Sequence, residues 1–97
     1  MNIAIVNDEK IDLETAEIFL RFYIKKFWAD YESKINIEVF YSARDFMQIF
    51  DVGLYHVIIL GTNLAEVAEF IRASGDYDAK VIFLKFNDNS EEGGGDL

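Results

Sequence analysis

The hydrophobic residues of the chain alternate between short apolar runs and longer stretches with helical spacing. Residues 3–6 form an apolar run that ends at a polar turn, which predicts a strand buried on both faces. From about Lys10 to Tyr31 the apolar residues recur at helical spacing and predict a long first helix. Residues 35–41 are rich in β-branched and aromatic residues and indicate a second strand.

Two polar pairs mark the starts of shorter helices. Ser42 followed by Asp45 has the spacing of a capping pair and predicts a helix that begins there. Asn63 followed by Glu66 has the same spacing and predicts a third helix, with Asn63 as its N-cap. Each of these pairs precedes residues with helical apolar spacing, so both helices should pack one face on a core.

Two further apolar runs, residues 55–60 and 81–84, predict a third and a fourth strand. The resulting order β-α-β-α-β-α-β calls for a parallel sheet with right-handed crossovers and helices on both faces. We therefore predict one domain over residues 1–86. Residues 87–97 are acidic, glycine-rich and without apolar periodicity, and they predict a C-terminal tail that is mobile or ordered only by contacts elsewhere.

Composition narrows the classes of function. The 97 residues are 52% hydrophobic, which is enough apolar material for one core. The net charge of −9 disfavours direct binding to nucleic acid and to anionic membranes, because phosphate groups repel it. The sequence contains no cysteine, which excludes disulfides and thiolate chemistry and fits a cytoplasmic protein. No apolar run is long enough to span a bilayer.

Four segments match one known family in their order and spacing, namely residues 1–9, 40–46, 55–60 and 80–84. They resemble the receiver domains of bacterial response regulators, in particular those attached to LytTR-class DNA-binding domains. The resemblance covers residues 1 to about 92. It implies a flavodoxin/CheY-like three-layer α/β sandwich with a parallel four-stranded sheet in the order 2-1-3-4. It also implies that the fourth helix, fifth strand and fifth helix of such a domain are missing.

The residues that carry receiver chemistry are mostly replaced. By resemblance, the acidic pair that holds Mg²⁺ falls on Asn7 and Asp8, the phosphorylated aspartate on Gly61, and a Thr or Ser position on Lys85. Gly61 offers no carboxylate to a phosphoryl group, and Asp8 alone is a poor ligand set for Mg²⁺. We expect a remnant receiver pocket of these four residues, with no cofactor, no metal site beyond Asp8 as a weak ligand, and no enzymatic activity.

The sequence allows two other interpretations of this region. A salt bridge between Asp8 and Lys85 is expected, because the carboxyl ends of neighbouring parallel strands converge. Alternatively, Gly61, Thr62 and Asn63 form a candidate anion-binding turn together with Lys85, which would make the chain a flavodoxin-like domain for a small anionic ligand. His56, the one histidine, has no histidine or cysteine partner and is expected to fill an ordinary strand position.

A second apolar stripe runs along the first predicted helix. Ile11, Ile18, Phe22 and Ala29 lie within about 40° of one another by 3.6-residue geometry. Without the later helices, the fourth strand becomes an edge, and we expect its apolar side chains to be uncovered. The predicted interface therefore comprises this stripe together with Val81 and Phe83.

These features lead to one predicted function and two alternatives. We predict a receiver-like signal-transduction module that acts by phosphorylation-independent protein–protein interaction, through self-association as a homodimer. By resemblance, a sensor kinase or another response regulator is a further partner. The alternatives are the anionic-ligand domain described above and a degenerate or engineered receiver fragment without activity.

Overall fold

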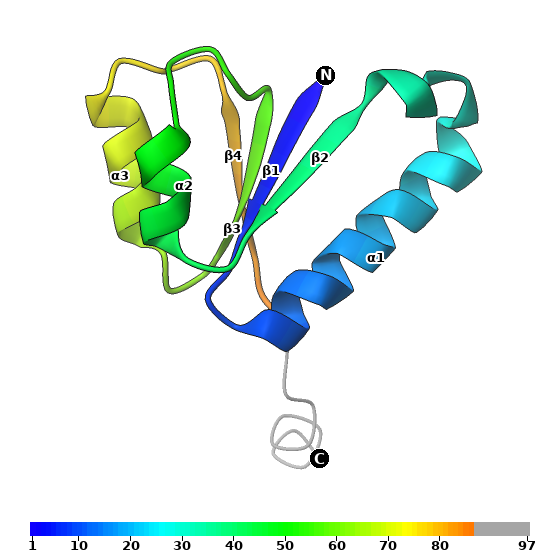
Figure 1. Ribbon diagram of the computed structural model, residues 1–97, viewed down its shortest axis with the longest axis horizontal. Coiled ribbons are helices and arrows are strands. Elements are labelled where there is room, and N and C mark those ends of the chain that lie inside the picture. Colours follow the sequence, from blue (N-terminus) through cyan, green and yellow to red (C-terminus); the bar gives the residue numbers. More distant parts are fainter. Residues whose placement is uncertain (87–97) are drawn as a thin grey trace, which may run out of the picture.

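Four parallel strands form the middle layer of the molecule (Figure 1). The computed structural model describes residues 1–86 of the chain, so the predicted tail at 87–97 lies outside the described residues. The strands lie side by side in the order β2-β1-β3-β4, which confirms the predicted order. Their bounds are β1 (Asn2–Val6), β2 (Asn36–Phe40), β3 (Val57–Gly61) and β4 (Lys80–Leu84).

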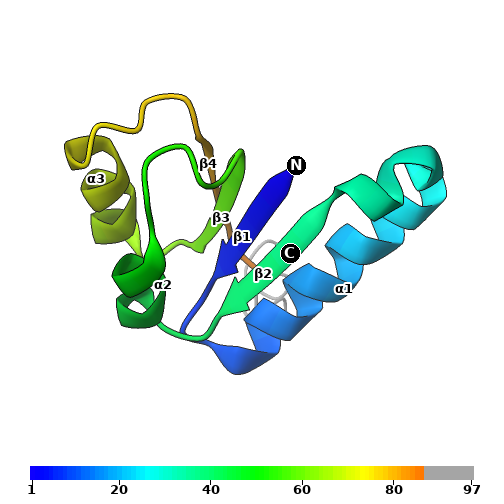
Figure 2. The same ribbon diagram turned by 45° about the horizontal axis from the view of Figure 1, so that its top comes forward.

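Helices cover both faces of this sheet. The long helix α1 (Lys10–Phe27) lies on one face, and α2 (Ala43–Ile49) and α3 (Ala65–Ala73) lie on the other (Figures 1 and 2). A 3₁₀ helix, η1 (Ala29–Lys34), connects α1 to β2. The predicted flavodoxin/CheY-like α/β fold is therefore confirmed. Among residues 1–86, no helix is long and apolar enough to cross a membrane.

The face that carries α2 and α3 holds the larger core. Phe46 of α2 is fully buried and forms edge-on or tilted contacts with Phe40, Phe50 and Tyr55. Large buried aromatic rings contribute several kcal/mol each through area removed from water. Ten buried residues belong to this cluster, so it supplies most of the apolar burial. They are Ala4, Val6, Phe46, Tyr55, Ile58, Leu60, Leu64, Val67, Ile71 and Ala79.

The face that carries α1 holds a smaller core. Only Ile5, Leu13 and Ala16 form its buried cluster, with partly buried neighbours around them. Figure 2 shows that α1 runs beside β2, and only its first half comes near the end of β4, where Leu84 packs against the cluster. This face of β3 and β4 is therefore covered much less than the other.

The structure corrects two predicted helix boundaries. The first helix ends at Phe27 instead of Tyr31, because the chain continues as η1 after the Trp28 N–H donates to the Ile24 carbonyl. The third helix begins at Ala65 and not at Asn63, which does not cap it. The predicted cap of the second helix is confirmed.

That cap is formed by Ser42, whose Oγ accepts a hydrogen bond of 3.1 Å from the Asp45 N–H. His56 lies immediately before β3. Its Nδ1 accepts a 3.0 Å hydrogen bond from the Asn2 N–H, which fixes the start of β1 beside β3. The predicted position of His56 within a strand is therefore wrong by one residue, and its side chain instead bonds to the start of β1.

Candidate functional site

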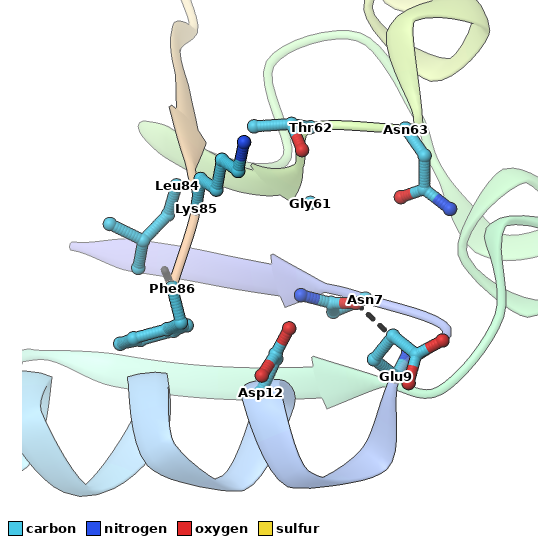
Figure 3. Close-up of a pocket in the computed structure, with 9 residues that line it drawn as sticks. All are labelled: Asn7, Glu9, Asp12, Gly61, Thr62, Asn63, Leu84, Lys85 and Phe86. Atoms are coloured by element: carbon cyan, nitrogen blue, oxygen red, sulfur yellow. Dashed lines mark hydrogen bonds between the residues drawn. The ribbon is translucent and has the colours of Figure 1, made fainter. Parts of the chain in front are cut away.

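A polar pocket opens where β1, β3 and β4 end (Figure 3). Its volume is about 190 Å³, and its walls come from the three strand ends, the β3–α3 turn and the first turn of α1. The lining residues are Asn7, Glu9, Asp12, Gly61, Thr62, Asn63, Leu84, Lys85 and Phe86. Three of the four predicted remnant-pocket residues meet here, and the predicted turn Gly61–Asn63 forms part of the same wall.

Asn7 fills the space beside Gly61. Asn7 is buried, and its Oδ1 accepts a 2.9 Å hydrogen bond from the Glu9 N–H. A Cβ atom added at Gly61 would lie 3.0 Å from the Asn7 side chain, closer than side chains normally approach. At the position that the receiver resemblance assigns to a phosphorylated aspartate, a side chain would therefore crowd the neighbouring asparagine.

The predicted salt bridge between Asp8 and Lys85 is not formed. The Asp8 carboxylate accepts hydrogen bonds of 3.2 and 3.3 Å from the Asn63 Nδ2 instead, and Asp8 is outside the pocket lining. Within residues 1–86, the ion pairs are Arg21–Glu17 and Lys25–Glu32. The Asp8–Asn63 contact joins the β1–α1 turn to the β3–α3 turn, and the N-cap position of α3 falls on Leu64, one residue after Asn63.

The charges of the pocket oppose an anionic ligand. Lys85 is its single cationic side chain, whereas Glu9 and Asp12 both line the opposite side near the start of α1 (Figure 3). Two carboxylates and one ammonium group leave the pocket with a negative balance. In the part of the chain that the structure describes, no three His, Asp or Glu side chains are placed to hold a metal ion.

A second hollow lies between α1 and the uncovered part of the sheet. It has a volume of about 220 Å³, and every lining residue is apolar or aromatic. We call it the apolar groove, and its lining residues are Met1, Ile3, Leu20, Tyr23, Trp28, Ile35, Val57, Ile59 and Ile82. Water in such a groove gains few hydrogen bonds, so covering it with apolar groups is favourable.

Only some of the predicted interface residues lie on one exposed surface. On the outer side of α1, Ile11, Ile18 and Phe22 are 77%, 67% and 59% exposed. Ala29 belongs to η1, so helical geometry does not extend to it, and its predicted place in the stripe is wrong. The predicted place of Val81 in the interface is also wrong, because Val81 packs against the core under α2 and α3.

On the edge strand, Phe83 is 44% exposed, as predicted for an uncovered side chain. The sequence reasoning missed Ile82, which is 39% exposed and faces the apolar groove. The alternation of side chains along β4 could have located it, because Ile82 must face away from Val81 and Phe83. The remaining groove residues depend on the exact path of α1 and η1, which the sequence pattern does not specify.

No protein-family model, curated protein or solved structure matched the chain in the comparisons. The α/β architecture rests on the structure itself, with its parallel sheet in the order β2-β1-β3-β4. The fold class is thus established, whereas the resemblance to receiver domains stays a prediction from the sequence.

Proposed function

We propose that the chain is a receiver-like signal-transduction module that acts by protein–protein contact without phosphorylation, with a second copy of itself as its partner. The observation that carries the proposal is the apolar groove beside α1, together with the exposed apolar side of α1 itself. Large contiguous apolar surfaces on small proteins usually mark interaction sites. A cytoplasmic location belongs to the same proposal.

The polar pocket supports a mode of action without phosphoryl transfer. The pocket presents no carboxylate at Gly61, and Asn7 occupies the adjoining space. An acyl phosphate requires a carboxylate oxygen as nucleophile, and Mg²⁺ requires several oxygen ligands around it. The proposal is therefore a non-enzymatic module. The anionic-ligand alternative is not favoured, because Glu9 and Asp12 oppose the charge of such a ligand.

The oligomeric state of the full chain tests this proposal. Sedimentation equilibrium and light scattering at micromolar concentrations should show a reversible dimer. A monodisperse monomer over this range would overturn self-association. In parallel, isothermal titration with Mg²⁺ should show no saturable binding, and a saturable isotherm would contradict the loss of receiver chemistry.

A further inference from the structure

The outer side of α1 carries a regular seam. Its members alternate in spacing between four and three residues, which keeps them in line along one side of a helix. They are Ile11, Thr15, Ile18, Phe22 and Lys25. The buried residues of α1, among them Leu13 and Ala16, face the sheet instead. The seam is thus an unoccupied helix-packing surface within residues 1–86, because the three large apolar members are all exposed.

The two halves of α1 carry opposite charges. After Lys10, the acidic residues lie in the first half and the basic residues in the second. They are Asp12, Glu14 and Glu17, followed by Arg21, Lys25 and Lys26. Glu17 and Arg21 neutralise each other at 2.9 Å within the chain. Lys25 also forms an exposed ion pair with Glu32 at 3.8 Å, and Asp12 lines the polar pocket. Within residues 1–86, Glu14 at one end and Lys26 at the other are therefore the charges best placed to interact with a partner.

This distribution selects one orientation for a second copy of the helix. If two α1 helices pack in parallel, Asp12 and Glu14 face their own counterparts and the lysines do the same, which is repulsive. If they pack antiparallel, each acidic end faces the basic end of the other copy. This contact occurs twice because the arrangement is symmetric.

The apolar seam agrees with the same orientation. An antiparallel pair with its two-fold axis near Leu20 sets Ile18 of each copy opposite Phe22 of the other, since the two residues lie equally far from the axis. The helix has 18 residues and is about 27 Å long at 1.5 Å per residue, which suffices for such a seam.

We infer that α1 is a homodimerisation helix that packs antiparallel against α1 of a second copy, with Ile18 and Phe22 at the centre of the contact and with the acidic end around Glu14 facing the basic end around Lys26 of the other copy. The inference rests on the proposed function, because it names the partner and the surface for self-association. A two-fold arrangement of this kind closes on itself and produces a dimer, not a filament.

Charge reversal at the two ends of α1 tests the orientation. One variant combines Asp12→Lys with Glu14→Lys, and the other combines Lys25→Glu with Lys26→Glu. Either variant alone places like charges at both contacts, and we expect its dimerisation constant to weaken about tenfold or more. An equimolar mixture of the two variants restores opposite charges at both contacts. It should therefore recover the dimer in sedimentation equilibrium.

Two matched controls separate this effect from general charge and folding effects. Glu66→Lys combined with Glu69→Lys on α3 changes the net charge by the same amount as the first variant and should leave the dimer intact. Because lysines near the start of α1 weaken the helix slightly, circular dichroism checks that each variant is folded. Ile18→Asp should abolish the dimer, whereas Ile49→Asp, at a similarly exposed isoleucine of α2, should not.

The outcomes distinguish the two proposals. A dimer that persists in Ile18→Asp, or a mixture of reversed variants that stays monomeric, would overturn the α1 pairing and leave self-association through another surface. A wild-type chain that is monomeric throughout would overturn the proposed function itself. If a charge-reversed variant does not fold, the comparison of Ile18→Asp with Ile49→Asp decides the inference alone.

Discussion

The two faces of the sheet are built from the same strands but differ in how completely they are covered. On β3, Ile58 points toward α2 and α3 and is fully buried, whereas its neighbour Ile59 points toward α1 and is only half-buried. Two helices pack on the first face and one on the second (Figure 1). The comparison indicates that the face under α2 and α3 provides most of the stability, whereas the face under α1 leaves apolar surface available for binding a partner.

The largest expected effect compares adjacent isoleucines on these two faces. Ile58→Ala should lower the free energy of unfolding by about 3–4 kcal/mol, because it leaves a cavity in the large core. Ile59→Ala on the same strand should cost only about 1–2 kcal/mol, because its side chain is already partly in water. Urea denaturation monitored by circular dichroism measures both values. Equal losses would mean that the two faces contribute alike.

A second substitution addresses the pocket at the strand ends. Gly61→Asp should destabilise the protein by about 2 kcal/mol, since its Cβ would crowd the Asn7 side chain at 3.0 Å. Combining it with Asn7→Ala should recover part of this loss, because the smaller side chain frees the space. Thermal unfolding of the three variants measures the coupling. Additive effects of the two substitutions would show that Asn7 and position 61 do not compete.

The smallest expected effect concerns a buried carboxylate on the α2/α3 side. Asp76 is 2% exposed and accepts backbone hydrogen bonds from Gly53, Asp78 and Ala79, so it ties the loop before β3 to the α3–β4 connection. The Gly53 N–H is the main cause that lowers the pKa of Asp76, with smaller contributions from Ala79, Asp78 and Arg72, while burial opposes the shift. Asp76→Asn should cost about 1 kcal/mol at neutral pH.

The pH dependence of this contribution has a defined sign. Because the pKa of Asp76 is lower in the folded chain than in the unfolded chain, the ionised carboxylate stabilises the fold at all pH values above about 5. The stabilisation is lost progressively as the pH falls below about 4, through the folded pKa. The difference in stability between wild type and Asp76→Asn should therefore shrink in acid. A constant difference down to pH 2 would assign the effect to shape instead of charge.

The parts of the structure that could be predicted are those determined by residues close together in the sequence. The succession of strands and helices along the chain follows from short apolar runs, and the Ser42 cap from a side chain that reaches three residues along the chain. The order of the strands in the sheet was implied by the family resemblance. Asn63 has the same local signal as Ser42, yet its amide bonds to Asp8, which is 55 positions away. The contact with Asp8 is a tertiary interaction, and the spacing of Asn63 and Glu66 could not predict it.

The residues of the polar pocket were largely predicted, whereas those of the apolar groove were not. The receiver resemblance implied that Asn7, Asp8, Gly61 and Lys85 lie together, and the structure places all of them except Asp8 in the lining of one pocket. The apolar groove was expected only as uncovered sheet, without its residues. Its walls depend on where α1 crosses the strands and on the turn through Trp28, and both are set by packing.

The close approach of Asn7 to Gly61 also bears on how this sequence could change over generations. An aspartate at position 61 would arrive next to a side chain that already fills its space, so that substitution is penalised while Asn7 is present. The side chains that positions 7 and 61 tolerate are thus linked, because a change at one position alters the space at the other.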